Sequence, residues 1–293
     1  MKIEDIRHVL VVGAGTMGRQ ISLQCAMHGY DVTLYDIAPE ALEAATGQLK
    51  EYAAHLVAWE RLSKKEADAA LKRITTTTKA REAAAQADLL SESVPEDPKL
   101  KCKVFAQFNK LCRPHTIFTT NSSELIPSLM AEKTGRPDKF AALHFRQHVW
   151  EANVVDIMPH PRTTKATVKL LHAFAERIGQ IPIILRKENP GYVFNTMLNA
   201  FLGSAVTLAM NGIASVEEID RAWTGVTKMI VGPFGILDAV GLDLAWHITE
   251  SGAKLTGDKQ LQAQADFLKQ YVDKGWLGVK SGRGFYRYSA TET

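Results

Sequence analysis

The sequence predicts an α/β protein in which a doubly wound parallel sheet precedes an all-helical C-terminal domain. Short apolar segments alternate with helical segments up to about residue 185. A glycine-rich turn joins the first apolar segment to the first helical one, and strand signals stop near residue 189 while helical periodicity continues. Such an alternation is typical of a mostly parallel sheet with helices on both faces.

The glycine-rich turn follows the pattern G-x-G-x-x-G, with Gly13, Gly15 and Gly18 at the glycine positions. An apolar strand over residues 9–12 precedes it and a predicted helix over 19–28 follows it. The first glycine allows a tight turn, the second lets backbone approach a pyrophosphate, and the third lets the helix pack close to the strand.

The start of that helix and the end of the next strand complete a predicted dinucleotide site. The N–H groups around Thr16 and Met17 face the negative charge of a ligand. Asp36 ends a predicted strand over 32–35, where its carboxylate accepts hydrogen bonds from a ribose, and no Arg or Lys follows directly to bind a 2′-phosphate. A Rossmann-type NAD site is therefore expected. The alternative is a glycine-rich turn in another α/β protein, with Asp36 as a solvated strand end.

The other elements of the sheet domain follow in order. Residues 39–72 predict one or two long helices broken near 62–63, where Ser63 and Glu66 fit a capping box. Helical periodicity predicts helices over 99–111 and 164–178, and β-branched or apolar runs predict strands over 74–78, 87–94, 117–120, 140–145, 154–158 and 181–185.

A change of character near Asn189 marks the predicted domain boundary. Residues 1–188 form the expected NAD-binding domain, and residues 189–293 form a helical domain for substrate binding and dimerisation. The active site is expected in the cleft between them, with 189–191 as a candidate hinge. The first predicted helix of the C-terminal domain, which starts at Val193, carries apolar residues on more than one face, and a homodimer is therefore expected. The predicted helices span 193–211, 216–226, 235–255 and 261–274.

Composition narrows the function classes. The chain has 293 residues, 46% of them hydrophobic and 23% charged, and a net charge of +3 is too small to indicate nucleic acid or a membrane surface as partner. No signal peptide and no apolar run of about 18 residues is found. The cysteines Cys25, Cys102 and Cys112 lack metal-ligand spacing and are odd in number. A cytoplasmic protein without a metal site is expected.

Several further motifs occur in a fixed order along nearly the whole chain. They are Ser93–Glu96, Thr120–Ser123, Leu143–Phe145, Asn189–Asn195, Gly232–Phe234 and Lys280–Tyr286. Together with the glycine-rich turn and Asp36, they resemble the short-chain L-3-hydroxyacyl-CoA dehydrogenase family.

The resemblance implies oxidation of the 3-hydroxyl of an acyl-CoA by NAD, or the reverse reduction. It implies that His144 is the catalytic histidine and that Asp156 replaces a glutamate that orients it. Ser123 and Asn195 match the residues that hold the substrate oxygen. The residues implied near the cofactor are Glu96, Lys101, Ser123, Gln147 and Lys280.

The implied chemistry needs a base, because loss of a hydride from C3 gives a carbonyl only if the hydroxyl proton also leaves. Histidine suits this role with an ordinary pKa of about 6.5, and a carboxylate on its far nitrogen stabilises the imidazolium. Each residue also has a structural interpretation. His144 would be a core histidine, Asp156 a strand-end charge and Asn195 a helix-surface residue, while Ser122 and Ser123 would cap a helix over 124–130.

The chain departs from the family pattern after the histidine, with Phe145-Arg146-Gln147-His148 in place of Phe-Phe-Asn-Pro. Loss of the proline frees φ at His148 and restores an N–H donor, so a different loop path is expected. Asp156 is shorter than glutamate by ~1.3 Å. Either the backbone moves closer or the pair is weak, in which case catalysis drops or another carboxylate, such as Glu151, takes over.

Arg146 raises the question of the substrate. A cation two residues after His144 would bind a carboxylate or phosphate, which suggests a free hydroxy acid or an acyl-CoA with an acidic tail. Alternatively, Arg146 points to solvent or pairs with a nearby acid. Lys64, Lys65 and Lys72 either receive CoA phosphates or form a solvated helix face. A dehydrogenase of a free hydroxy acid and a catalytically weak NAD-binding protein remain alternative functions.

Overall fold

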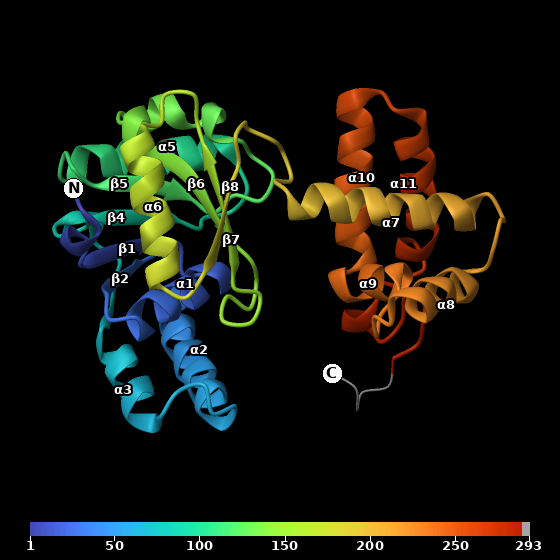
Figure 1. Ribbon diagram of the computed structural model, residues 1–293, viewed down its shortest axis with the longest axis horizontal. Helices are drawn as coiled ribbons and strands as arrows, with labels where there is room; N and C mark the ends of the chain where they lie inside the picture. Colours follow the sequence, from blue (N-terminus) through green and yellow to red (C-terminus); the bar gives the residue numbers. More distant parts are fainter. Residues whose placement is uncertain (289–293) are drawn as a thin grey trace. The chain divides into compact units, whose positions relative to one another are not determined.

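The computed structural model describes residues 1–288, and the chain divides into two compact units between Val193 and Phe194 (Figure 1). The first unit holds the sheet and the second holds helices only. The sequence analysis places the boundary at 188/189, in the irregular segment before the first helix of the second unit.

The first unit contains one eight-stranded sheet with the order β3-β2-β1-β4-β5-β6-β7-β8. All neighbouring strands are parallel except β6 and β7, which run antiparallel. The predicted doubly wound sheet is thereby confirmed. The strands are β1 (His8–Val12), β2 (Asp31–Tyr35), β3 (Ile74–Thr77), β4 (Leu89–Glu92), β5 (Ile117–Thr120), β6 (Phe140–Phe145), β7 (Val154–Pro159) and β8 (Ile181–Ile184).

Helices cover both faces of this sheet, as the alternating apolar side chains of β1 show. Val9 and Val11 belong to one buried cluster, while Leu10 and Val12 belong to another. Each face thus has its own core, which explains why the central strands are continuous apolar runs. The helices of the first unit are α1 (Thr16–Met27), α2 (Pro39–Ala58), α3 (Lys64–Lys72), α4 (Ala80–Ala84), α5 (Pro98–Leu111) and α6 (Lys165–Arg177), with 3₁₀ turns at Ile3–Asp5, Pro127–Leu129, Ala131–Thr134 and Pro137–Lys139.

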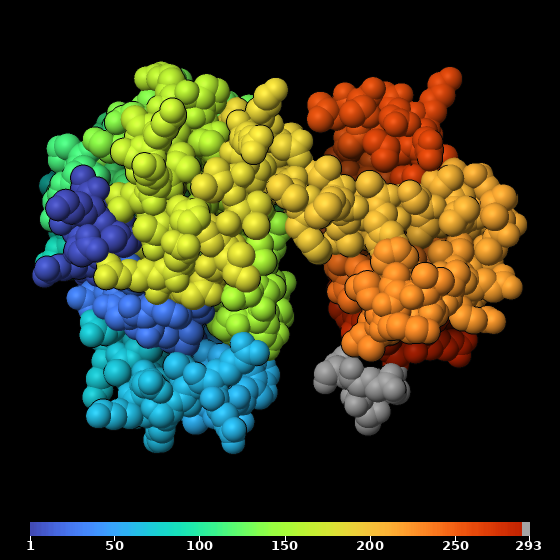
Figure 2. Space-filling view, viewed as in Figure 1, coloured from blue at the N-terminus to red at the C-terminus, as the bar shows by residue number. Residues whose placement is uncertain are grey.

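The predicted break in residues 39–72 is confirmed. Ser63 caps α3 and accepts a hydrogen bond from the Glu66 N–H, while the Glu66 carboxylate accepts one from the Ser63 N–H, which completes the capping box. α2 and α3 form a helical pair that the space-filling view shows as a lobe of the first unit (Figure 2). Lys64, Lys65 and Lys72 are exposed on this lobe.

The second unit contains five α-helices among its described residues. The prediction of a single helix over 235–255 is wrong, because Gly241 adopts φ +99° and separates two helices. Apolar periodicity continues across this glycine and concealed the break. The helices are α7 (Phe194–Met210), α8 (Val216–Thr227), α9 (Pro233–Val240), α10 (Leu242–Thr256) and α11 (Lys259–Val272), followed by a 3₁₀ turn at Val279–Ser281.

Candidate active site

The glycine-rich turn lies at the carboxyl end of β1, between β2 and β4, where the strand order reverses and such sheets bind ligands. Gly13 has φ +106°, and a Cβ there would lie 2.6 Å from the Ser93 carbonyl oxygen. A Cβ at Gly18 would lie 1.8 Å from the Gly13 oxygen. A Cβ at Gly15 would meet no heavy atom within 4 Å. The fold therefore requires the first and third glycines, whereas the second leaves open space beside the backbone.

The surroundings of Gly15 fit the phosphates and ribose of a dinucleotide. Gly15 is the N-cap of α1, so the free N–H groups of the first turn, which contains Thr16 and Met17, begin here. Asp36 follows β2 and accepts hydrogen bonds from the Ala14 N–H (2.8 Å) and the Ala38 N–H (3.1 Å). Each carboxylate oxygen retains lone-pair capacity for a ribose hydroxyl.

Two carboxylates and a lysine form a network beyond β4, in which Glu92 and Lys101 are buried and Glu96 is exposed. The Lys101 Nζ lies 2.7 Å from Glu92 Oε1 and 3.2 Å from Glu96 Oε2, and it donates to the Val94 carbonyl. Burial raises the pKa of Glu92, and Lys101 counteracts this rise. Burial also acts to raise the pKa of Glu96, but Lys101 and the Ser122 hydroxyl hold it below its ordinary value. A glutamate inside an apolar strand signals such a network, although the sequence analysis did not single out Glu92.

The Glu96 carboxylate organises the loop that follows β5. Its Oε1 accepts hydrogen bonds from the Ser122 hydroxyl and from the N–H groups of Ser123 (3.1 Å) and Glu124 (3.0 Å). No α-helix forms over 124–130, so the alternative in which Ser122 and Ser123 cap such a helix is wrong. Ser123 is half-buried and its backbone is held by a carboxylate at the carboxyl edge of the sheet.

His144 and Asp156 face each other across β6 and β7 as direct cross-strand partners. The Nδ1 atom of His144 lies 3.4 Å from Asp156 Oδ2, and both side chains are buried. This separation exceeds the usual length of an N–H···O bond, about 2.7–3.2 Å. The strand register thus brings the shorter carboxylate opposite the imidazole, but the hydrogen bond between them is long.

Arg146 makes the closer contact with the same carboxylate. Its Nη2 lies 2.5 Å from Asp156 Oδ2, and the Arg146 side chain is only 14% exposed. The interpretation in which Arg146 pairs with a nearby acid thus agrees with this geometry. Burial lowers the pKa of His144, and Arg146 lowers it further, whereas Asp156 and Glu96 act to raise it.

Tyr192, quoted in a motif but given no role by the sequence analysis, packs on the catalytic candidate. Its ring is stacked on that of His144, with centroids 4.5 Å apart, and its hydroxyl donates to the Ser122 carbonyl at 2.7 Å. Tyr192 has φ +55°, a conformation that costs of order 1–3 kcal/mol for a non-glycine residue. One side chain therefore links the histidine to the serine loop.

The loop after β6 takes a path that proline could not follow. His148 has φ +59°, whereas proline is restricted to about −65°. The His148 N–H donates to Gln20 Oε1 at 2.7 Å, which connects the loop to α1. Gln147 and Glu151 are both exposed in this loop. The loop uses both the φ that the loss of proline frees and the N–H donor that it restores.

The remaining predicted site residues lie in the second unit. Asn195 is in the first turn of α7 and is half-buried. Lys280 is exposed and pairs with Asp243, with Nζ 2.6 Å from Oδ1. Within residues 1–288, no cluster of three or more His, Cys, Asp or Glu side chains could hold a metal ion. No helix in the described part of the chain is long and apolar enough to cross a membrane.

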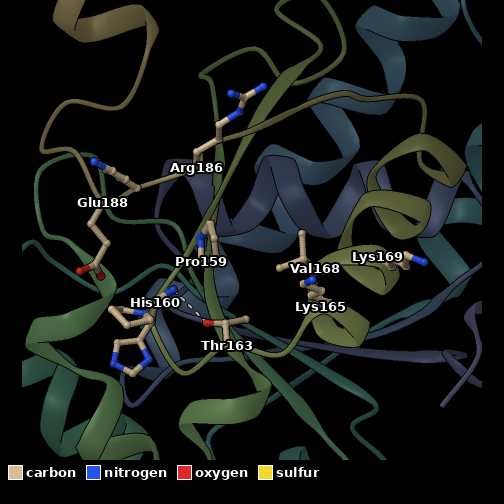
Figure 3. Close-up of a pocket in the computed structure, with 10 residues that line it drawn as sticks. Pro159, His160, Thr163, Lys165, Val168, Lys169, Arg186 and Glu188 are labelled. Atoms are coloured by element: carbon tan, nitrogen blue, oxygen red, sulfur yellow. Dashed lines mark hydrogen bonds between the residues drawn. The ribbon is translucent and has the colours of Figure 1, made fainter.

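A cavity of about 620 Å³ lies elsewhere in the first unit, between the end of β7, the start of α6 and the segment after β8 (Figure 3). It is lined by several cations, and none of the predicted site residues lines it. In Figure 3 the Arg186 side chain extends upward and the Lys169 side chain extends to the right, so these two cations do not converge on one point.

Comparison with known proteins shows that both units match domains of the same enzyme family. Residues 8–189 match the NAD-binding domain of 3-hydroxyacyl-CoA dehydrogenase, and residues 191–288 match the C-terminal domain of that enzyme. A probable 3-hydroxybutyryl-CoA dehydrogenase of Bacillus subtilis is 32% identical over 284 residues, which covers 97% of this chain and 98% of the relative.

Solved structures also match over nearly the whole chain, among them a diketoreductase and a dehydrogenase. A diketoreductase, described as performing substrate-directed dual catalysis of dicarbonyl compounds, is 40% identical with a TM-score of 0.89, and the match covers 97% of this chain and 99% of that one. (S)-3-hydroxybutyryl-CoA dehydrogenase from Ralstonia eutropha is 30% identical, with the same TM-score and the same coverage.

Proposed function

The chain belongs to the 3-hydroxyacyl-CoA dehydrogenase family, and we propose that it uses NAD to oxidise the 3-hydroxyl of a 3-hydroxyacyl-CoA to the 3-ketoacyl-CoA, reversibly. The observation that carries this proposal is the buried cross-strand pair of His144 and Asp156. It supplies a proton acceptor with a carboxylate behind it, at the sheet edge that also bears the dinucleotide site.

The proposed cofactor site begins at the glycine-rich turn. Gly13, Gly15 and Gly18 shape the backbone around the pyrophosphate, the α1 N-terminus at Thr16 and Met17 faces its charge, and Asp36 accepts from the ribose. NAD, when bound, accepts the hydride that leaves C3. Further proposed contacts involve Glu96, Lys101, Ser123, Gln147 and Lys280.

In the proposed mechanism, His144 accepts the hydroxyl proton. Its Nδ1 faces Asp156, so Nε2 is the nitrogen available to the substrate, and Asp156 stabilises the imidazolium that forms. Ser123 and Asn195 donate hydrogen bonds to the substrate oxygen, which gains negative charge in the reduction direction. Tyr192 restricts the imidazole to one orientation by stacking on it.

The proposal that the substrate carries CoA is supported by exposed positive charge on α3. Lys64, Lys65 and Lys72 are exposed on α3, with none of them in an ion pair within the described residues, and they suit the phosphates of CoA. A second candidate is reduction of a dicarbonyl compound without CoA. The 40% identity to the diketoreductase favours it, and it agrees with the hydroxy-acid alternative drawn from the sequence.

A single assay compares these candidates. NADH consumption is followed with acetoacetyl-CoA and with free acetoacetate, using wild-type protein and His144→Ala. Consumption with the thioester alone, lost in the variant, supports the proposal. Consumption with the free acid alone supports the second candidate. Measurable NADH binding without turnover of either compound contradicts both assignments and favours a catalytically weak NAD-binding protein.

We also propose a homodimer in a reducing compartment, the cytoplasm. The second unit exposes large apolar side chains around the end of α8 and the start of α9, among them Val226 (83% exposed) and Ile230 (98%). Patches of this kind mark interaction surfaces. The three cysteines are free thiols. Light scattering after gel filtration should give twice the chain mass, and Ile230→Asp should reduce it to the monomer.

A further inference from the structure

We propose that Arg146 is a positioning residue of the active site, which holds the Asp156 carboxylate and thereby sets the pH range over which His144 exchanges protons. The kinetic part of this inference rests on the proposed function. The electrostatic part concerns only side chains of the first unit and can be tested without substrate or cofactor.

The geometry gives Arg146 the stronger claim on the shared oxygen. Asp156 Oδ2 lies 2.5 Å from Arg146 Nη2 and 3.4 Å from His144 Nδ1. Since charge-assisted N–H···O bonds are about 2.7–2.9 Å long, the arginine contact is tight and the histidine contact is weak. Asp156 is 1% exposed, so bulk water hardly reaches its carboxylate and does not replace the arginine as a partner.

The ion pair with Arg146 reduces how strongly the Asp156 carboxylate stabilises the protonated form of His144. A buried carboxylate without a cation would gain strongly from an imidazolium beside it, and would therefore favour protonation of His144. Arg146 already compensates the charge of Asp156, whatever the protonation state of the ring. The imidazolium consequently gains less, and His144 is held in its neutral, proton-accepting form to a lower pH.

Other groups around the ring act in known directions. Glu96, from the segment between β4 and α5, favours the imidazolium, and Tyr192 covers one ring face without adding charge at neutral pH. Burial and Arg146 oppose the imidazolium and outweigh both carboxylates, so that the pKa of His144 lies below its ordinary value. Arg146 is the one cation among these groups, and its removal should reverse part of the shift.

The direct test is an NMR titration of the imidazole in the ligand-free, full-length protein. The signals of His144 are assigned among the nine histidines by their loss in His144→Gln. Arg146→Gln should raise the proton affinity of His144 about tenfold, because it removes a cation adjacent to the shared carboxylate. Arg146→Lys retains the charge and should keep the proton affinity within about threefold of the wild type. An unchanged or lower affinity in Arg146→Gln, with unfolding curves showing a folded protein, overturns the inference.

A double-variant cycle identifies the route of the effect. In an Asp156→Asn background there is no carboxylate to hold, and Arg146→Gln should change the proton affinity of His144 by clearly less than tenfold. If the full change persisted there, Arg146 would act on the imidazole directly and the positioning role would be refuted. Should Arg146→Gln fail to fold, Arg146→Met takes its place in the two backgrounds, because it also removes the charge and keeps an unbranched side chain over the same buried carboxylate.

Kinetics add a separate readout if acyl-CoA turnover is found. In Arg146→Gln, the pH below which kcat/KM for oxidation declines should rise in step with the NMR titration, since oxidation needs the neutral imidazole. A titration shift without turnover in any variant would contradict the proposed function and leave the role of Arg146 intact. Turnover with a pH profile that does not move would contradict the role of Arg146.

Discussion

Replacing Gly15 with alanine should separate cofactor binding from folding. The backbone at Gly15 has φ −69° and ψ −173°, which alanine adopts without strain, and a Cβ there meets no protein atom within 4 Å. Alanine reduces the freedom of the unfolded chain but is a poorer N-cap than glycine. These two effects oppose each other, so the free energy of unfolding should change by less than about 1 kcal/mol.

The effect on cofactor binding should be much larger, because the added methyl group occupies the space left for the pyrophosphate. Forcing one extra carbon into a filled site costs roughly 1–3 kcal/mol, which corresponds to an increase in Kd of about 5- to 150-fold. NADH fluorescence titration measures the Kd, and urea unfolding measures the stability of the same samples. The expected result is weak NADH binding by a protein of nearly wild-type stability.

Two other glycine substitutions provide the controls. Gly47→Ala also adds a methyl group in open space, on the exposed face of α2, and should leave the NADH Kd unchanged. Gly18→Ala places a Cβ 1.8 Å from the Gly13 oxygen and should destabilise the fold itself. A Kd for Gly15→Ala within twofold of the wild type would refute the placement of the pyrophosphate at this turn.

Three further predictions follow from charges. Burial lowers the pKa of His144 below 6.5, so the rate of oxidation should hold at pH 6.5 and fall only as the pH drops through the lowered pKa. The rate of reduction, which needs the imidazolium, should decline as the pH rises through the same pKa, and kcat/KM measured against pH in both directions checks this. Wild-type protein should bind NADH at least about tenfold more tightly than NADPH, and Asp36→Ala should narrow that ratio, as measured by titration. Asp238→Ala should cost at least about 3 kcal/mol in urea unfolding with NADH binding retained, because Asp238 accepts hydrogen bonds from the Phe285 and Tyr286 N–H groups and the Tyr288 hydroxyl.

Most of the sheet could be predicted from the sequence because its signals are local. A buried parallel strand is an apolar run, and the turn after β1 needs glycine for reasons confined to a few residues. The exceptions also have local causes. α4 (Ala80–Ala84) is too short to show a period, and Gly241 interrupts a segment whose apolar pattern continues on both sides.

The site was less accessible to such reasoning, because its contacts join residues far apart in the chain. The stacking of Tyr192 on His144 and the hydrogen bond of Tyr192 to Ser122 depend on where distant elements pack. The network of Glu92, Lys101 and Glu96 is similar, although two of its members were named for another role. The motifs predicted which residues belong to the site, whereas the contacts between them depend on the tertiary fold.

The departures after His144 looked independent in the sequence but are physically linked. Loss of proline lets His148 adopt φ +59° and anchor the loop to Gln20 on α1. Arg146, two residues earlier, reaches back to β7 and pairs with Asp156. A glutamate at position 156 would place its carboxylate ~1.3 Å further along and would crowd the Arg146 guanidinium, which already lies 2.5 Å from Asp156 Oδ2. The shorter acid and the arginine therefore form one arrangement, and replacing Asp156 with glutamate alone should lower kcat/KM in the NADH assay unless Arg146 is changed with it.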